Sequence, residues 1–100
     1  MSEENDELVF LDGFLDVPPD RLEAVSAALP THIQLTHAEP GCVSLTIIPS
    51  EEVEGRLLIE EVFTDHAAFD AHQERIQNSE WSSVTEGIPR EYVIRKRKKG

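Results

Sequence analysis

Two ionisable side chains stand in apolar surroundings in this sequence, and together they could abstract a proton. His72 belongs to the stretch EEVFTDHAAFDAHQERI, residues 60–76, which reads as a strand end, a helix N-cap at Thr64 or Asp65, and a helix. Positions 68, 69, 72 and 76 share one helical face, so the imidazole interrupts a stripe of Ala, Phe and Ile. His72 therefore points towards whatever this helix packs on.

Glu61 makes a similar interruption in the strand that precedes this helix. Side chains at alternate strand positions share a face, so Glu61 stands in a row with Leu57, Ile59 and Phe63. If that row faces the helix, the carboxylate and the imidazole meet in one apolar layer, where each needs the other as a hydrogen-bond partner. Two interpretations follow: a core pair that fixes the helix on the sheet, or a carboxylate-oriented histidine that acts as a general base.

Length and composition favour one domain in a reducing compartment. The chain has 100 residues and a single cysteine, Cys42, which cannot form an internal disulfide, and we expect a cytoplasmic protein. No apolar run approaches the roughly 20 residues of a membrane span. The N-terminal MSEENDE is acidic and lacks the apolar centre of a signal peptide. We therefore expect no membrane partner.

The charge is unevenly distributed along the chain. Five of the nine basic residues lie in RKRKK, residues 95–99, so residues 1–94 carry all 20 acidic residues against four basic ones. Such a body repels polyanions, which argues against a nucleic-acid partner. We expect a disordered acidic N-terminus over 1–7, one domain over 8–95, and a solvated basic tail over 96–100.

The order of apolar segments predicts an α+β, ferredoxin-like fold. Strands are expected over 8–17, 42–48, 56–63 and 90–97, with a helix between the first two, a second helix at about 65–77, and a short helical turn within 78–87. Pro30 should kink or split the first helix, and Gly13 is a candidate bulge. The resulting β-α-β-β-α-β order places four antiparallel strands beneath two helices.

The first and third strands are apolar on both alternating sets of residues, which indicates two buried faces. Helices can cover only one of these faces. The other is best covered by a second copy of the sheet, so we expect a homodimer that forms a dimeric α+β barrel.

Three segments resemble the antibiotic biosynthesis monooxygenase (ABM) family, which includes small quinol monooxygenases. EVFTDHAAFDAH, residues 61–72, resembles the family segment E-x-[WYF]-x-[DS]-x-x-A-[LF]-x-x-H. AEPGCVSL, residues 38–45, resembles its E-x-G-C segment, and NSEW, residues 78–81, resembles the segment after its second helix. The resemblance spans roughly residues 8–95.

This resemblance implies a function and a site. The better-known members oxidise phenols or quinols with O2 and need no metal, flavin or haem, so we expect no cofactor and a small aromatic substrate. By matching positions, Glu61, Phe63 and His72 would line a pocket between helices and sheet. We expect His72 to be the base or a hydrogen-bond partner of the substrate, oriented by Glu61. The substrate-binding residues are expected to be Phe63, Phe69, Ile59 and Trp81.

Departures from the family and weaker constellations keep alternatives open. Phe63 and Leu45 stand where many members carry a polar ring, and the first strand lacks the Asn of haem-degrading relatives. A non-catalytic dimeric barrel that binds a small apolar ligand, or an isomerase on the same scaffold, would also fit. His66 and Asp70 are four residues apart and could share a metal, but an exposed helix pair is favoured, and no metal site is expected.

Overall fold

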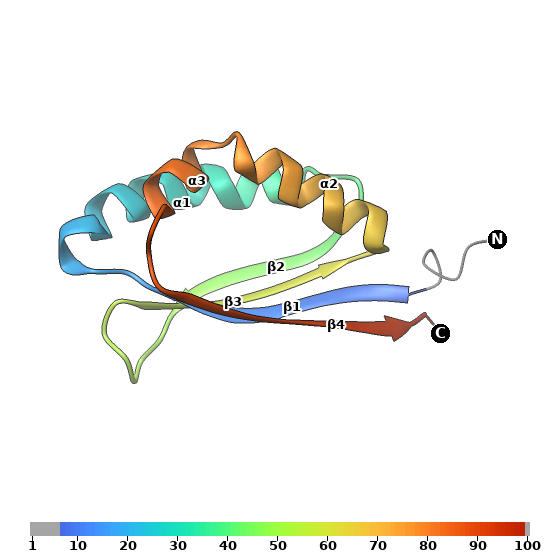
Figure 1. Cartoon of the computed structure of the whole chain (residues 1–100), viewed down its shortest axis with the longest axis horizontal. Coiled ribbons are helices and arrows are strands. Elements are labelled where there is room, and N and C mark those ends of the chain that lie inside the picture. Colours follow the sequence, from blue (N-terminus) through green and yellow to red (C-terminus); the bar gives the residue numbers. More distant parts are fainter. Residues whose placement is uncertain (1–6, 100) are drawn as a thin grey trace.

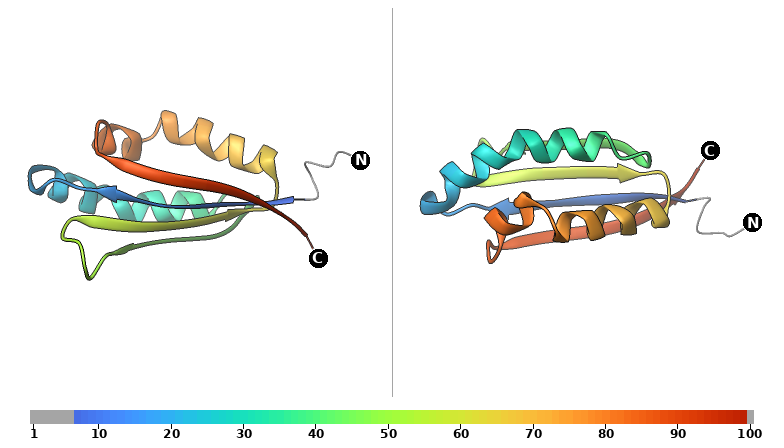
Figure 2. Two further views of the ribbon diagram at one scale, coloured as in Figure 1. Left: turned by 60° about the horizontal axis from the view of Figure 1, so that its bottom comes forward. Right: turned by 90° about the horizontal axis from the view of Figure 1, so that it is seen from above.

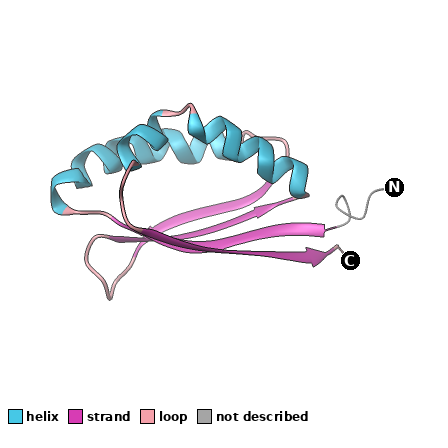
Figure 3. Ribbon diagram, viewed as in Figure 1, coloured by secondary structure: helices cyan, strands magenta, loops and turns pink. Residues whose placement is uncertain are grey.

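The computed structural model describes residues 7–99, and its elements follow the predicted order. They are β1 (Glu7–Asp16), the 3-10 turn η2 (Pro19–Arg21), α1 (Leu22–His37), β2 (Cys42–Pro49), β3 (Arg56–Phe63), α2 (His66–Gln77), α3 (Glu80–Thr85) and β4 (Arg90–Lys98) (Figure 3). The ferredoxin-like β-α-β-β-α-β order is therefore confirmed, and the short helical turn expected within 78–87 is α3.

All strand pairs are antiparallel, and the sheet order is β2-β3-β1-β4. The helices form one layer on a single face of this sheet, and the other face carries no helix (Figure 1). Seen from above, α1 lies on the β2 side of the layer, whereas α2 and α3 lie on the β4 side (Figure 2). The sheet and the helix layer therefore enclose the space in which the core and the candidate site lie.

The alternation of the strands separates a buried face from an open one. On β1 and β3 the residues that face the helices are buried: Val9, Leu11, Leu15, Leu57, Ile59, Glu61 and Phe63. Their neighbours on the open face include large apolar side chains that keep a substantial exposed fraction, namely Leu58 on β3, Ile48 on β2 and Val93 on β4. Both sets of residues include large apolar side chains, and only one set is covered within the chain.

The structure shows neither a split of α1 at Pro30 nor a bulge at Gly13. α1 is not split, because it continues through Pro30, which is exposed, so the helix loses one hydrogen bond on its solvent side without a clash in the core. Gly13 pairs in regular register with Ile59 and Tyr92, and the bulge lies between Cys42 and Ser44 instead.

Gly13 is needed for a different reason. A Cβ atom at this position would lie 2.4 Å from Cδ1 of Tyr92 on β4. Its absence allows the aromatic ring of Tyr92 to lie across β1.

The predicted termini also need correction where the structure describes them. Residues 1–6 of the expected N-terminal segment lie outside the described residues, but Glu7 belongs to β1 and pairs with Lys98. Lys96 pairs with Val9 and Arg97 with Leu8, so β4 includes residues that we expected in the solvated tail. The sequence prediction failed here because a run of basic residues is typical of a solvated tail. In an edge strand such as β4, however, the side chains can stay exposed to water while the backbone pairs with its neighbour.

None of the helices described over residues 7–99 is long and apolar enough to cross a lipid bilayer.

Candidate active site

The buried face of α2 brings His72 towards the sheet. Asp65 caps the helix by accepting a hydrogen bond from the Ala68 backbone N–H at 2.8 Å, which starts α2 one residue later. From that start, Phe69 and His72 become the buried residues of α2, as the sequence predicts. Only 1% of the His72 surface is exposed, so the imidazole lies entirely within the protein.

Glu39 holds the His72 ring from the side of α1. Its carboxylate accepts a hydrogen bond from Nδ1–H of His72, with the two oxygens at 2.9 and 3.1 Å, and another from Nε of Arg75. Arg75 also donates from Nη2 to Thr36 Oγ1 at 2.9 Å. Because Glu39 accepts a hydrogen bond from Nδ1–H, the proton stays on Nδ1, and Nε2 is directed away, towards the sheet.

The turn that carries Glu39 reaches α2 because of Gly41. A Cβ atom at Gly41 would lie 2.2 Å from the Cβ of Ala68, so another residue would push the turn away from the helix. The Gly41 carbonyl also accepts a hydrogen bond from the Thr64 N–H at 2.9 Å. The glycine of the EPGC segment therefore supports the contact between Glu39 and His72.

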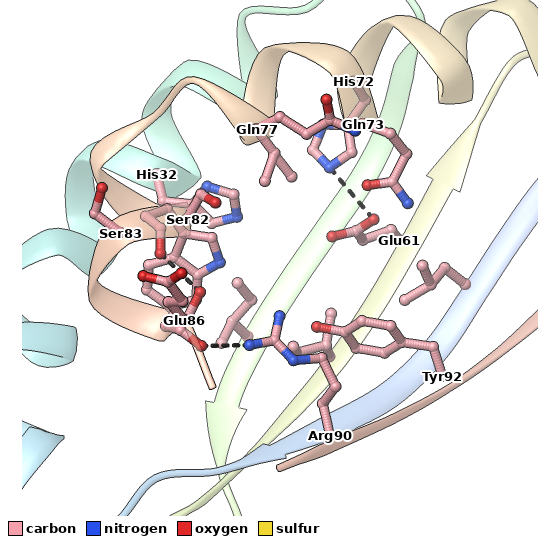
Figure 4. A pocket seen from close by; sticks show the side chains of 16 residues that line it. His32, Glu61, His72, Gln73, Gln77, Ser82, Ser83, Glu86, Arg90 and Tyr92 are labelled. Carbon is pink, nitrogen blue, oxygen red and sulfur yellow. Dashed lines mark hydrogen bonds and ion pairs between the residues drawn. The ribbon is translucent and has the colours of Figure 1, made fainter. Parts of the chain in front are cut away.

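Glu61 lies on the opposite side of the imidazole. Its Oε1 is 3.6 Å from Nε2 of His72, beyond the range of a normal hydrogen bond, and Nε2 has no hydrogen-bond partner within residues 7–99 (Figure 4). The structure thus brings together the two predicted catalytic residues. It corrects their relation, because Glu39 rather than Glu61 is the carboxylate that orients the ring.

A cavity of about 370 Å³ adjoins this pair, between the helix layer and the sheet. Apolar side chains of the sheet line it at Leu11, Ile47 and Ile59, and polar side chains reach it from α2, α3 and β4 (Figure 4). This volume falls within the range of sites for small organic ligands. The cavity therefore combines space for a small ring with a buried histidine and a carboxylate.

The predicted substrate-binding residues divide into two groups. Ile59 and Trp81 line the cavity. Phe63 and Phe69 are not among its lining residues, and they pack against each other with ring centres 5.7 Å apart. The Phe63 ring centre is 4.7 Å from that of His72, so this side chain supports the imidazole instead.

Trp81 is held in place by α3. Ser79 caps this short helix by accepting from the Ser82 N–H at 3.3 Å, and Arg21 ties it to the start of α1 by donating to the Val84 carbonyl at 2.6 Å. Thr85 donates to the Trp81 carbonyl at 2.7 Å. These contacts place the indole, which is buried, against the cavity.

Most of the residues that line the cavity were not predicted as site residues, and four of the unpredicted residues matter for its chemistry. Glu39 supports His72, while His32, Arg90 and Tyr92 line the cavity. The position of His32 was detectable, because it shares the buried face of α1 with Val25, Ala28 and Thr36. The others depend on a turn and on an edge strand, for which the sequence carries no comparable periodic signal.

Burial controls the protonation of three groups near the cavity. Burial, followed by the positive potential of His72 and Arg75, lowers the pKa of His32 from 6.5 to about 4, so its imidazole is neutral at pH 7. Burial also raises the pKa of the Tyr92 phenol, and Glu61 adds to this effect, so Tyr92 stays protonated and can donate a hydrogen bond. Burial, with Glu39 and Glu61 nearby, raises the pKa of the Cys42 thiol.

The weaker metal candidate stays on the surface. His66 Nε2 lies 3.3 Å from Asp70 Oδ2 across one turn of α2, and more than a third of each side chain is exposed. Among residues 7–99, no three His, Cys, Asp or Glu side chains form a group that could hold a metal ion.

Comparison with known proteins identifies the family. The sequence model of the antibiotic biosynthesis monooxygenase family matches residues 8–81, and the chain belongs to this family. This confirms the resemblance carried by the three sequence segments. An uncharacterised protein of Synechocystis sp. is 33% identical over 67 residues, which is 67% of this chain and 46% of that protein. The chain thus matches less than half the length of this relative.

Solved structures share the fold. A Nitrosomonas europaea protein assigned to antibiotic biosynthesis monooxygenases superposes with a TM-score of 0.76 at 21% identity, covering 95% of this chain and 93% of that one. A variant of SnoaB, described as a cofactor-independent oxygenase from Streptomyces nogalater, gives a TM-score of 0.73 at 17% identity, covering 95% and 96%. At these identities the likeness establishes the fold alone.

Proposed function

We propose that this protein is a cofactor-independent monooxygenase that oxidises a small quinol or a phenolic, polyketide-like aromatic with O2. The observation that carries the proposal is the His72 imidazole, which Glu39 holds at Nδ1 while Nε2 faces Glu61 beside a cavity. A fixed imidazole next to space for a ring is the arrangement that removal of a phenolic proton requires. Membership of the family and the oxygenase with a similar fold agree with this chemistry.

In the proposed reaction, the Glu61–His72 pair first removes the hydroxyl proton of the substrate. The resulting anion is electron-rich and reduces O2, which forms a hydroperoxide at a ring carbon that carries hydrogen. When that carbon loses its hydrogen and the O–O bond breaks, one oxygen atom remains as a carbonyl and the other leaves as water. The substrate supplies all the electrons, and the proton held by the pair returns to the departing oxygen.

Other lining residues support this role by their chemistry. Ile59 and Trp81 provide apolar contact for the ring, and the protonated Tyr92 phenol can donate to an oxygen that gains negative charge. Arg90 keeps its guanidinium at the cavity wall by donating to the carbonyls of Ile88 and Thr85. Phe63 limits the movement of the His72 ring through its close packing.

The proposal includes a homodimer in the cytoplasm. Leu58, Ile48 and Val93 leave apolar surface on the sheet face opposite the helices, and a second copy would cover it. The single cysteine, which is partly buried, supports the cytoplasmic part of the proposal, because disulfides are rare in that compartment.

Oxygen uptake with a panel of quinols and phenols tests the proposed activity. We expect uptake by the wild-type protein and a loss of about 100-fold or more in His72→Ala, the scale for removal of a general base. His66→Ala is the matched control, because it removes an imidazole from the same helix that is partly exposed and does not line the cavity. Binding without uptake would favour a non-catalytic ligand-binding barrel, and rearrangement without uptake would favour an isomerase; either result overturns the proposal.

A further inference from the structure

A second buried imidazole faces the same cavity. His32 is only 4% exposed, it lines the cavity, and its Nδ1 has no hydrogen-bond partner among the described residues. Buried polar atoms are nearly always paired in native proteins, and an exception needs an explanation. A ligand oxygen in the cavity could supply a partner for the imidazole of His32.

Neighbouring side chains fix the direction in which His32 can bind. Its ring stacks on the indole of Trp81 with centres 4.5 Å apart and planes inclined by 7°, and the imidazole points into the cavity (Figure 4). Because the pKa of His32 is lowered to about 4 by burial, the ring is neutral at pH 7 and offers one donor and one acceptor. This chemistry suits a hydroxyl or a carbonyl oxygen better than an anion.

The two imidazoles approach the cavity from the same layer. His32 comes from α1 and His72 from α2, and their ring centres are 6.3 Å apart. A hydrogen bond spans about 2.9 Å, so two rings this close on one wall can reach two oxygens on one edge of a planar ligand.

We propose that His32 binds a second oxygen of the substrate, next to the oxygen that faces the Glu61–His72 pair. This inference rests on the proposed function and narrows its substrate class. The substrate is then an aromatic compound with two neighbouring oxygen substituents, such as an ortho-diol or a ring hydroxyl beside a carbonyl. His32 thereby determines specificity for the second oxygen, and its imidazole stays neutral while it binds that oxygen.

Three probes with the same apolar body separate this inference from a general affinity for phenols. They are tert-butylcatechol, tert-butylphenol and tert-butylhydroquinone, titrated without oxygen so that none is consumed. Trp81 is the only tryptophan in the sequence, so quenching of its fluorescence reports occupancy of the cavity. The variant is His32→Phe, which keeps an aromatic ring against Trp81 but removes both nitrogens.

We expect His32→Phe to weaken tert-butylcatechol binding by about tenfold, and binding of the other two probes by less than about twofold. His37→Phe is the matched control, since His37 lies at the end of α1 and its Nε2 contacts the Leu45 carbonyl instead of the cavity. In wild-type protein, the nitrogen resonances of His32 should shift with tert-butylcatechol and not with tert-butylphenol, which tests the contact even if the variant does not fold.

Each other outcome has a defined meaning. An equal loss for all three probes, a selective loss for the hydroquinone, or unshifted His32 resonances would overturn the inference and leave the proposed function standing. Failure of all three probes to bind the wild-type protein would overturn both the inference and the assignment of the cavity as a site for phenols.

Discussion

At the scale of single residues, the two nitrogens of His72 have different partners. Nδ1 is held by the Glu39 carboxylate, whereas Nε2 faces the carboxylate of Glu61 at 3.6 Å without a hydrogen bond. A proton placed between Nε2 and Glu61 could be exchanged with a ligand without any movement of the bond to Glu39. The contact with Glu39 therefore positions the ring, whereas Nε2, beside Glu61, remains available to exchange a proton with a ligand.

Removal of Glu39 should destabilise the protein. Glu39→Ala leaves Nδ1 of the fully buried His72 unpaired and removes an ion pair from Arg75, so we expect a loss of about 2 kcal/mol or more in the free energy of unfolding. Urea denaturation at fixed protein concentration measures this loss. Glu74→Ala, an exposed change on α2, the helix that carries His72 and Arg75, is the control and should alter stability by less than about 0.5 kcal/mol. Equal effects of the two substitutions would contradict the role given to Glu39.

His32 should make stability depend on pH. Its pKa is 6.5 in the unfolded chain and about 4 in the folded protein, so below pH 6.5 the unfolded state binds more protons. Stability should therefore fall as the pH drops from 6.5 to about 4, by about 3 kcal/mol at most. Urea denaturation across this range should show a smaller fall for His32→Phe than for the wild-type protein. Parallel pH profiles would show that folding does not lower the pKa of His32.

At the scale of secondary structure, periodic segments were predicted well and aperiodic ones were not. β3 occupies Arg56–Phe63 as expected, because the alternation of buried residues there is strong. The prediction of a kink or a split at Pro30 was wrong about the split, because the sequence shows the missing N–H but not that the residue faces solvent.

The candidate site shows the same division. His72 and Glu61 were predicted as neighbours because each interrupts an apolar row, and the register of α2 on β3 does bring them close. Glu39 reaches His72 through a turn whose path depends on Gly41 packing against α2, and no repeat in the sequence indicates that path. Tyr92 reaches the cavity from an edge strand opposite Gly13, a pairing that only the folded sheet defines.

The basic end of β4 belongs to an element rather than to a tail, so its deletion should affect folding. Lys96, Arg97 and Lys98 pair with the first residues of β1, and removal of residues 96–100 would leave that part of β1 without a neighbour on one side. We expect a loss of about 1–3 kcal/mol in the free energy of unfolding, measured by urea denaturation, since each backbone hydrogen bond contributes about 1 kcal/mol.

Replacing Lys96 and Lys98 by Thr is the control for this truncation. These substitutions remove charge but keep the strand, so they should cost less than about 0.5 kcal/mol if backbone pairing is the cause. If the control is as destabilising as the truncation, charge rather than strand pairing stabilises this end of the sheet.

At the scale of the whole molecule, the two faces of the sheet differ in what covers them. The face beneath the helices contributes Leu11, Ile59 and Glu61 to the cavity that the buried histidines also line. The opposite face carries apolar residues between charged pairs such as Arg56 with Asp16, whose Nε and Oδ1 lie 2.7 Å apart. The guanidinium of Arg56 also lies 3.6 Å from the centre of the Phe14 ring. A partner that covers this face must therefore accept both apolar and charged side chains.

A second copy of the chain would meet this requirement, because around a two-fold axis it would present the same apolar and charged residues to the open face. We expect a homodimer that buries roughly 2,000 Å² or more in total. Leu58 lies beside Phe14 on the open face, so Leu58→Glu should place charge within the interface and shift sedimentation towards the monomer at micromolar concentration. Leu22→Glu, which changes an exposed leucine at the start of α1, should leave the association unchanged. A wild-type protein that sediments as a stable monomer would contradict the dimer and would leave the apolar face of the sheet to a different partner.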